Sequence, residues 1–260
     1  MKFTSQLILP VLILIGSFFT SSAMACTTSF WNGGEIGTLE VGSPLAVSRV
    51  SGECAMKIVD NDGGVIDNSP STETTANIRF YVYADLNSGA PVIFEAYSAD
   101  TAGGTLLASV TFNGTNFVFD AGAGASGNVP GTAGWNLVEM AWIGGTSMDY
   151  WVNADSTSTA ATGSVTAAAG TMESVVLGAV STIDGSLTFD SYEARRLSPV
   201  GALTMGDANS DDAINILDIG VITSEILLTG LGQGQPDCNS DASVNILDIG
   251  CATNIILSAP

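Results

Sequence analysis

The feature that most constrains this chain is a duplication near its C-terminus. Residues 207–220 read DANSDDAINILDIG and residues 237–250 read DCNSDASVNILDIG, an offset of 237 − 207 = 30 residues. The hexapeptide NILDIG is identical in both copies. A repeat at a fixed period predicts two copies of one supersecondary unit, which bury their apolar faces by packing together.

The spacing of oxygen-bearing residues in each copy predicts a calcium loop. Calcium takes about six to eight oxygen ligands, which a loop of roughly 12 residues supplies from positions 1, 3, 5, 7, 9 and 12. The alternative is an acidic, solvated turn, but two copies in one register favour two calcium ions as cofactors. The expected ligands are Asp207, Asn209, Asp211, Ala213 (through its backbone carbonyl), Asn215 and Asp218, and in the second copy Asp237, Asn239, Asp241, Ser243, Asn245 and Asp248.

Each loop is followed by isoleucines at helical spacing, which predicts two short helices packed face to face. This duplicated module, residues 204–260, resembles the type I dockerin, in which the twelfth ligand is Asp, as Asp218 and Asp248 are here. The resemblance implies an interaction module whose partner is a cohesin-like or cell-surface protein. The isoleucines are Ile216, Ile219, Ile222 and Ile226, and in the second copy Ile246, Ile249 and Ile256.

The module departs from the dockerin pattern at two places in each loop. Asp212 and Ala242 occupy the sixth position, where Gly usually makes the sharp turn. Ile216-Leu217 and Ile246-Leu247 stand at positions ten and eleven, where cellulosomal dockerins tend to carry small hydroxyl residues. A conventional cohesin partner therefore does not follow. If these apolar pairs are exposed they favour docking, and if buried they favour a calcium-stabilised cap without a partner.

Residues 1–25 have the pattern of a signal peptide. Lys2 is the positive end, residues 7–19 are apolar, and Ala23-Met24-Ala25 is a small-x-small cleavage site. The apolar stretch is shorter than the about 20 residues of a membrane span. We expect a secreted or cell-surface protein with no transmembrane segment. Lipidation at Cys26 is the alternative, although Ala23 stands where a lipoprotein signal normally has Leu.

Four cysteines in an oxidising compartment favour disulfides over free thiols. Of the three possible pairings we prefer Cys26–Cys54 with Cys238–Cys251, because each bridge then stays within one module. Beyond residue 25 the chain has 26 acidic and 6 − 1 = 5 basic residues, a net charge of about −21. Such a charge argues against nucleic acid and anionic membrane surfaces as partners.

The region between the signal peptide and the duplication has short alternating segments separated by Gly, Asn and Asp, the pattern of an all-β domain. Asn113-Gly114 and Gly144-Gly145 predict tight hairpins. About a dozen strands at this spacing indicate a β-sandwich or barrel. The clearest strands are residues 77–84, 91–98, 105–112, 116–121, 135–143, 147–153, 174–180 and 186–194.

Three of these segments, residues 67–85, 135–155 and 175–196, resemble the concanavalin A-like or laminin-G-like jelly roll. The resemblance covers residues 26–197 and implies a mainly β jelly-roll sandwich followed by a small α-helical dockerin-like module. Residues 198–203 contain Pro199 and Gly201 and are expected to form the linker, with a hinge at residues 198–201. Bacterial proteins with a dockerin often act in polysaccharide degradation, which makes a polysaccharide a possible partner.

The chain has no His, which excludes Ser-His-Asp and His-metal catalysis. Glycoside hydrolysis would need two carboxylates about 5 to 9.5 Å apart. Asp190 and Glu193 are three residues apart, so strand parity places them on opposite faces, and we expect them to solvate an edge. An unfamiliar carboxylate pair keeps a hydrolase of O-glycosyl bonds as an alternative, beside a purely structural surface protein.

Alternating aromatic and polar residues favour carbohydrate binding without catalysis. If the faces that carry them coincide on one sheet, they would give aromatic platforms beside polar groups. The alternative is that these aromatic side chains only pack against a sheet. The candidate ligand-binding residues are Arg79, Tyr81, Tyr83, Glu95, Tyr97, Asp149 and Trp151.

Overall fold

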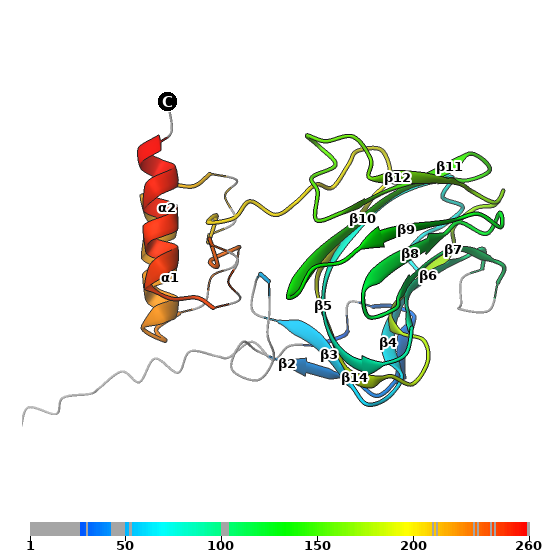
Figure 1. The fold of residues 1–260 in the computed structure, drawn as a ribbon, viewed down its shortest axis with the longest axis horizontal. Helices are drawn as coiled ribbons and strands as arrows, with labels where there is room; N and C mark the ends of the chain where they lie inside the picture. Colours follow the sequence, from blue (N-terminus) through cyan, green and yellow to red (C-terminus); the bar gives the residue numbers. More distant parts are fainter. Residues whose placement is uncertain are drawn as a thin grey trace, which may run out of the picture.

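The computed structural model describes residues 27–29, 31–42, 50, 51, 54–99, 104–209, 211, 213–230, 232, 234–239, 241 and 243–258. The predicted signal peptide, its cleavage site and Cys26 lie outside the described residues. Within them the chain is mainly β, with two helices near the C-terminus (Figure 1). No helix in this described part combines the length and apolarity that a membrane crossing requires.

Two seven-stranded antiparallel sheets pack face to face, and we call them sheet A and sheet B. Sheet A has the order β1 (Gly34–Gly37), β4 (Gly63–Asp67), β13 (Ser174–Ala179), β6 (Val92–Tyr97), β7 (Leu106–Phe112), β8 (Asn116–Asp120), β9 (Ser126–Pro130). Sheet B has the order β12 (Gly163–Thr166), β11 (Ser147–Val152), β10 (Trp135–Ile143), β5 (Thr75–Ser88), β14 (Asp184–Arg195), β3 (Ala55–Val59), β2 (Glu40–Gly42). The predicted β-sandwich is confirmed.

The eight predicted strands correspond to β5, β6, β7, β8, β10, β11, β13 and β14. The strands β1, β2, β3, β4, β9 and β12 are no longer than five residues, and their alternation was too short to mark them in the sequence. Both predicted hairpins form, β7 with β8 and β10 with β11. At the first of them Gly114 has a φ of 86°, a left-handed conformation that Gly adopts without strain.

The core lies between the two sheets and follows from period-two alternation. On β5, Phe80 and Val82 are fully buried in this core, whereas Arg79 and Tyr81 point to the outer face of sheet B. Phe94 on sheet A stacks on Phe80 with ring centroids 5.9 Å apart. Burial of such aromatic and aliphatic side chains is the main favourable term in the folding of a sandwich of this size.

A bulge in β14 overturns the parity expected of two acidic residues. Asp190 lies opposite Tyr81 and Glu193 lies opposite Arg79, so three residues of β14 span two residues of β5. Ser191, with a φ of 52°, occupies the bulge. The extra residue returns Asp190 and Glu193 to the same outer face. The expectation that they solvate an edge was wrong for Asp190, which is buried. Glu193 is 36% exposed and lies beyond the part of β14 that pairs with β3.

The C-terminal module contains α1 (Ile216–Ile226) and α2 (Ile246–Ser258), which begin where the isoleucine spacing predicts. Asn215 caps α1 and forms a capping box with Asp218. The helices pack through Ile222 and Ala252, both fully buried, together with partly buried side chains such as Ile219, Ile249 and Ile255. Three isoleucines of the predicted packing faces are not part of this cluster, and the first two are 70 and 68% exposed: Ile216, Ile246 and Ile256. The helices therefore pack through only part of the predicted set.

The predicted Cys238–Cys251 disulfide is present, with its Cα atoms 5.8 Å apart. It links the second loop to α2 within the module. Cys54 is also disulfide-bonded, and its predicted partner Cys26 lies outside the described residues.

The expected linker, residues 198–203, is hydrogen-bonded to the sandwich. The backbone N–H groups of Val200 and Gly201 donate to Oε1 of Glu139, at 2.9 and 3.1 Å. Nη1 of Arg79 donates to the carbonyl of Gly201 at 3.1 Å. Arg79 and Glu139 lie opposite each other on β5 and β10, so two neighbouring strands hold the same turn of the linker. The C-terminal module therefore lies beside the outer face of sheet B (Figure 1).

Candidate ligand-binding cleft and calcium loops

A cleft of about 750 Å³ lies between the outer face of sheet B and the C-terminal module. Its volume falls in the range of about 300 to 1,000 Å³ typical of small-ligand sites. The side of the cleft formed by β5 and β10 is called the floor, and the side formed by Gln235, Asp237 and Asp241 is called the wall. The lining residues are Val50, Tyr81, Tyr83, Thr132, Ala133, Gly134, Trp135, Leu137, Asn153, Ala154, Asp155, Ala202, Met205, Gln235, Asp237 and Asp241.

The floor is aromatic because of strand register. Trp135 pairs with Tyr83 and Leu137 pairs with Tyr81 across β10 and β5, so all four side chains emerge on one face. The rings of Tyr83 and Trp135 meet edge to face, with centroids 5.8 Å apart. The hydroxyl of Tyr81 accepts a 3.0 Å hydrogen bond from the backbone N–H of Leu203, which ties the floor to the linker.

Most polar groups around the floor already form hydrogen bonds within the protein. Asn153, at the end of β11, accepts from the N–H of Leu137 at 2.9 Å and donates to Asn136 and Thr132. Hydrogen bonds from the side chain and the backbone of Thr157 lower the pKa of Asp155, so its carboxylate stays ionised through the mildly acidic range. The cleft lining includes three acids and no Lys or Arg among its described residues. The site is therefore unfavourable for anionic ligands.

Two buried polar atoms in the cleft lining have no hydrogen-bond partner among the described residues. They are Nε1 of Trp135 on the floor and Oε1 of Gln235 on the wall. A buried polar atom that lacks a partner is costly, by about 1 to 3 kcal/mol. One donor and one acceptor of this kind can both be satisfied by a hydroxyl group, which donates and accepts at once.

The structure brings together only part of the predicted ligand-binding set. Tyr81 and Tyr83 line the cleft. Arg79 is buried beneath the linker, and its guanidinium also forms a 3.0 Å ion pair with Glu193. The ring of Trp151 is buried outside the cleft, and its Nε1 donates to the carbonyl of Thr159 at 3.2 Å. Asp149 lies on the same strand, also outside the cleft.

Glu95 and Tyr97 lie on β6, which belongs to sheet A, so the face that carries them does not coincide with the face of Tyr81. The hydroxyl of Tyr97 donates to Oε2 of Glu95 at 2.5 Å. Burial, and then this bond to a carboxylate, raises the pKa of Tyr97. The pair is separated from the cleft by both sheets and the core between them.

Three cleft residues were not predicted from the sequence: Trp135, Leu137 and Gln235. Pairing residues 135–143 with residues 77–84 in antiparallel register would have placed Trp135 and Leu137 beside the two tyrosines. No local signal could have found Gln235, because it reaches the cleft only through the docking of the module on sheet B.

The two loops repeat the same hydrogen bonds. Asp218 accepts from the N–H of Asn209 at 3.1 Å and of Asn215 at 2.8 Å, and Asp248 accepts from Asn239 and Asn245 at the same distances. Both twelfth-position acids are fully buried. At the fifth position, the N–H of Asp211 donates to Asp207 and Asn209 at 3.1 and 3.0 Å, which brings two of the expected ligand oxygens together.

The donor chemistry of the loops fits calcium, although carboxylates alone would not form the site. In the described part of the chain, no three His, Cys, Asp or Glu side chains come close enough to hold a metal ion. Amide oxygens of Asn and backbone carbonyls would have to complete the set, and such all-oxygen sets suit a hard cation. Residues 204–260 also contain no Lys or Arg to balance the two buried carboxylates, and a buried charge without a counter-charge is costly.

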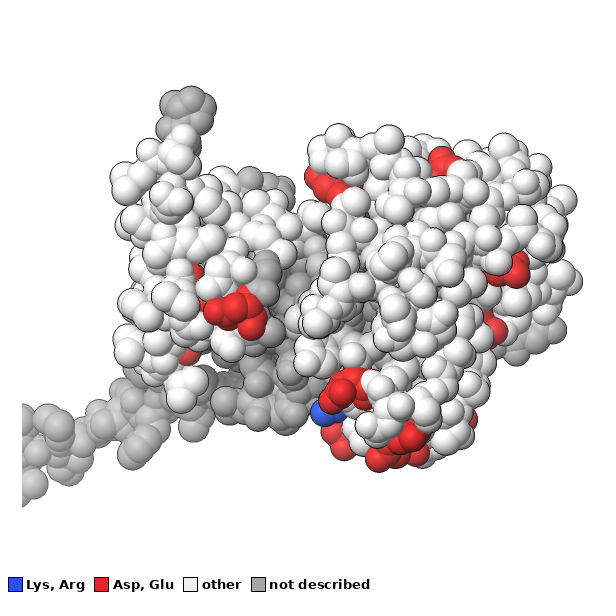
Figure 2. Space-filling model, viewed as in Figure 1, with Lys and Arg blue, Asp and Glu red and all other residues white. Residues whose placement is uncertain are grey.

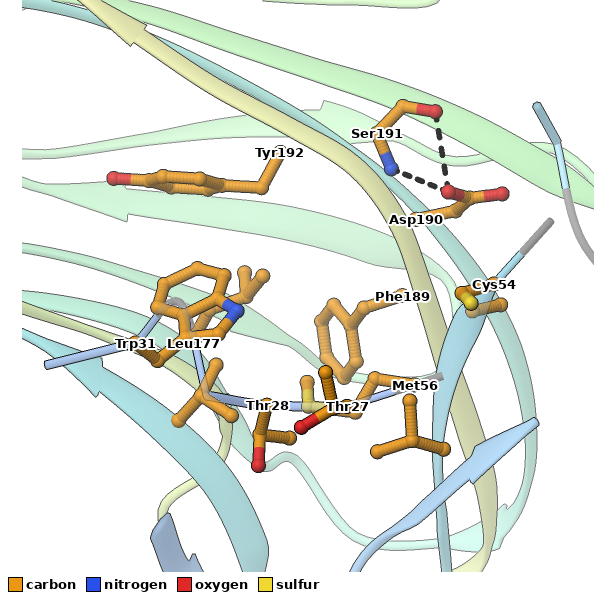
Figure 3. A pocket seen from close by; sticks show the side chains of 13 residues that line it. Thr27, Thr28, Trp31, Cys54, Met56, Leu177, Phe189, Asp190, Ser191 and Tyr192 are labelled. Atoms are coloured by element: carbon orange, nitrogen blue, oxygen red, sulfur yellow. Dashed lines mark hydrogen bonds between the residues drawn. The ribbon is translucent and has the colours of Figure 1, made fainter. Parts of the chain in front are cut away.

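A second hollow, of about 260 Å³, opens between the sheets beside Thr27, Thr28 and Trp31. Figure 3 shows Trp31 and Tyr192 at one end and Asp190, bonded to Ser191, at the other. Asp190 also accepts from the backbone N–H groups of Val50 and Ser51. Burial raises its pKa to about 6. Because backbone N–H groups already bind this carboxylate, the hollow does not present two free carboxylates, as glycoside hydrolysis would require.

Acidic side chains lie on both modules in the view of Figure 2, whereas basic atoms show at one place near the lower edge of the sandwich. Three of the few basic residues, Arg79, Arg195 and Arg196, are each paired with a carboxylate. This distribution agrees with the argument from composition against polyanionic partners.

No protein-family model matches this chain, and neither does any curated protein. Among solved structures it is similar to the botulinum neurotoxin serotype D binding domain, with 13% identity over 72% of this chain and 47% of that chain, at a TM-score of 0.44. It is also similar to the cellulose induced protein Cip1, with 13% identity over 70% of this chain and 92% of that chain, at a TM-score of 0.45. The chain spans less than half the length of the toxin domains it matches. These similarities identify no family.

Proposed function

We propose that this chain is an exported, non-catalytic protein that binds an uncharged saccharide in the cleft between sheet B and its calcium-stabilised C-terminal module. The observation that carries the proposal is the cleft itself, with Tyr81, Tyr83 and Trp135 on its floor. Aromatic faces beside a few fixed polar groups suit the apolar faces and hydroxyl groups of sugars. The acidic lining without Lys or Arg favours uncharged sugars over uronic or sulfated ones.

Binding is favoured over glycoside hydrolysis by the state of the carboxylates on sheet B. The bulge puts Asp190 and Glu193 on one face, but backbone donors occupy Asp190 and two arginines bind Glu193. The other buried acid of sheet B in the described residues, Glu139, holds the linker through Oε1. A hydrolase would need one acid free to protonate the leaving group and a second one free as base or nucleophile.

A glycan array combined with a reducing-sugar release assay tests the proposal on purified residues 26–260 with calcium present. We expect binding of an uncharged polysaccharide without release of sugar. Trp135→Ala should weaken binding by about 1 to 3 kcal/mol, since it removes a large part of the aromatic floor. Tyr97→Ala, an aromatic change on the opposite sheet, is the control and should leave binding unchanged. Sugar release, or equal effects of the two substitutions, would contradict the proposal.

The calcium part of the proposal is supported by the doubled all-oxygen loops and their buried Asp218 and Asp248. At a calcium concentration of about 100 times the dissociation constant, each site would stabilise the folded module by about 2.7 kcal/mol. Thermal melts of the whole chain with calcium and with chelator should therefore differ in the transition of the module. Asp207→Ala combined with Asp237→Ala should reproduce the chelator melt, and identical melts with and without calcium would exclude the sites.

A second candidate function is docking onto a receptor protein, which the dockerin resemblance suggests to be cohesin-like. It is favoured by the exposure of Ile216, Leu217, Ile246 and Leu247, which are 70, 61, 68 and 61% exposed. These four side chains occupy equivalent places at the starts of α1 and α2, and exposed apolar patches mark interfaces. A buried arrangement would instead have favoured a cap.

The test for docking is a pull-down from the secreted fraction of the source organism, followed by direct binding of the recovered protein. Substituting all four residues by Ser should abolish that binding and leave the melt of the module unchanged. A partner that still binds the substituted chain, or no partner at all, would count for the cap.

A further inference from the structure

The two loops are nearly identical in sequence, yet of their described residues only those of the second loop line the cleft. Asp237 and Asp241 line the wall together with Gln235, whereas their equivalents in the first loop, Asp207 and Asp211, are not among its described lining residues. Local hydrogen bonds at the fifth position are the same in both loops. Nδ2 of Asn209 donates to Asp211 at 2.9 Å, and Nδ2 of Asn239 donates to Asp241 at 3.0 Å. The difference therefore comes from the docking of the module and not from loop geometry.

The wall and the floor are connected through short hydrogen-bonded steps. Tyr81 on the floor holds the N–H of Leu203, four residues before the first loop begins. At the start of that loop, Gln235 donates its N–H to the carbonyl of Asp207 at 2.6 Å and accepts from the N–H of Gly206 at 3.0 Å. Gln235 stands two residues before Asp237, the first expected ligand of the second loop. A conformational change in the second loop can therefore alter the cleft through only a few intervening residues.

The two unpartnered atoms of the cleft come one from each module. Nε1 of Trp135 belongs to the sandwich and Oε1 of Gln235 belongs to the C-terminal module, and both are buried. Both atoms are enclosed by protein, so a sugar hydroxyl could bridge them only if the wall shifted relative to the floor. The position of Gln235, and hence the order of the second loop, would then decide how well the cleft binds.

We propose that the cleft is a composite site in which calcium bound by the second loop raises the affinity for saccharide. This inference rests on the proposed saccharide-binding function. Without a cation, Asp237 and Asp241 on the wall carry like charges in one short loop and repel each other. A bound cation would neutralise them, order the loop and hold Gln235 toward the floor. By linkage, the saccharide must raise the calcium affinity of the second loop by the same factor.

The experiment uses the chain of residues 26–260 and a matched pair of substitutions, Asp241→Asn in the second loop and Asp211→Asn in the first. Saccharide affinity is measured by calorimetry with cellohexaose, xylohexaose and mannohexaose, in calcium and in chelator. We expect calcium to strengthen binding by about 5- to 150-fold, the usual size of such coupling. Asp241→Asn should lose most of this gain and Asp211→Asn should retain it.

A third variant, Gln235→Met, covers the case in which Asp241→Asn fails to fold. It removes the acceptor from the wall without changing an expected calcium ligand, so saccharide affinity should fall while calcium affinity stays the same. A calcium titration followed by tryptophan fluorescence needs no saccharide. Its signal should depend on Trp135 and on Asp241 but not on Asp211.

The outcomes separate this inference from the function on which it rests. Saccharide binding of equal strength in calcium and chelator, or equal losses in the two Asp→Asn variants, would overturn the composite site and leave saccharide binding intact. No binding of any saccharide, together with no calcium response at Trp135, would overturn both. A calcium response at Trp135 that requires Asp241, without saccharide binding, would overturn only the ligand class and would support the coupling.

Discussion

Replacing Arg79 by Met should release the linker from sheet B. The side chain of Arg79 is 7% exposed. Its guanidinium donates to the carbonyl of Gly201 at 3.1 Å, to the carbonyl of Ser191 at 3.3 Å and to Oε2 of Glu193 at 3.0 Å. Methionine keeps much of the apolar stem but supplies no donor. The carbonyls of Gly201 and Ser191 lose this donor, and Glu193 keeps only its pair with Arg195. On the next strand, Glu139 loses its only cross-strand positive neighbour on β5.

The expected loss can be estimated from the kind of contact removed. Removing one partner of a buried ion pair costs about 3 to 5 kcal/mol. Glu193 is 36% exposed, so solvent recovers part of this, and a loss of about 3 kcal/mol is expected. For a domain of about 150 to 250 residues, each kcal/mol shifts the Tm by about 2 to 4 °C. The Tm of the sandwich should therefore fall by roughly 6 to 12 °C.

Thermal melts of the whole chain, with limited proteolysis across residues 198–203, measure both consequences. Arg195→Met is the comparison, because Arg195 pairs with the other oxygen of Glu193 at 2.7 Å but is 44% exposed. Arg195 also donates to the carbonyl of Pro199 in the linker at 3.1 Å, but this bond is exposed, so water can replace it. Exposed pairs contribute about 0 to 1 kcal/mol, so Arg195→Met should shift the Tm by only a few degrees. If the two substitutions shift the Tm equally and leave the linker equally resistant to protease, the assignment of Arg79 as the anchor is refuted.

Three further predictions concern other parts of the chain. Burial raises the pKa of Asp190 to about 6, so the folded state holds this proton more tightly than the unfolded state, and its contribution to stability is lost as pH rises from about 4 to 6. Asp190→Asn should reduce that pH-dependent loss of the free energy of unfolding by about 3 kcal/mol, as measured by urea titrations at pH 4 to 7. If the free energy of unfolding of the variant changes with pH as it does in the unsubstituted chain, the prediction is contradicted. Cys238→Ala with Cys251→Ala opens a link of sequence separation 13 and should destabilise the module by about 3 kcal/mol in calcium, seen as a lower Tm of that transition only. Gly178→Ala should destabilise the sandwich, because a Cβ there would lie 2.3 Å from the carbonyl oxygen of Gly63; an unchanged melting temperature would show that the two strands can separate without cost.

The strands and helices could be predicted because their signals involve only a few consecutive residues. Alternation at period two marks one face of a strand whatever it pairs with, so residues 77–84 and 135–143 were identified without knowing that they are neighbours. The Asn113-Gly114 hairpin, the helices after each loop and the Cys238–Cys251 pairing are equally local. The calcium ligands stay a prediction from spacing, supported by the donor chemistry of the loops.

Strand parity failed where a bulge intervened. Asp190 and Glu193 share a face because Ser191 adds one residue to β14. No local sequence pattern predicts this bulge. The bulge is stabilised by a distant segment, since Asp190 accepts hydrogen bonds from Val50 and Ser51, about 140 residues earlier in the chain. A local rule cannot include contacts of that separation.

By itself, the sequence determined the class of fold, the doubled loop and the chemical types of residue available, because these depend on composition and short-range spacing. The tertiary structure alone decided which sheet each strand joined, and so separated Glu95 and Tyr97 from Tyr81 and Tyr83. It also decided that the linker lies on sheet B, through bonds such as that between Tyr81 and Leu203, 122 residues apart. The cleft exists only because of that docking, since its floor belongs to sheet B and its wall to the C-terminal module. These segments are brought together by the packing of the whole chain, which no local sequence pattern specifies.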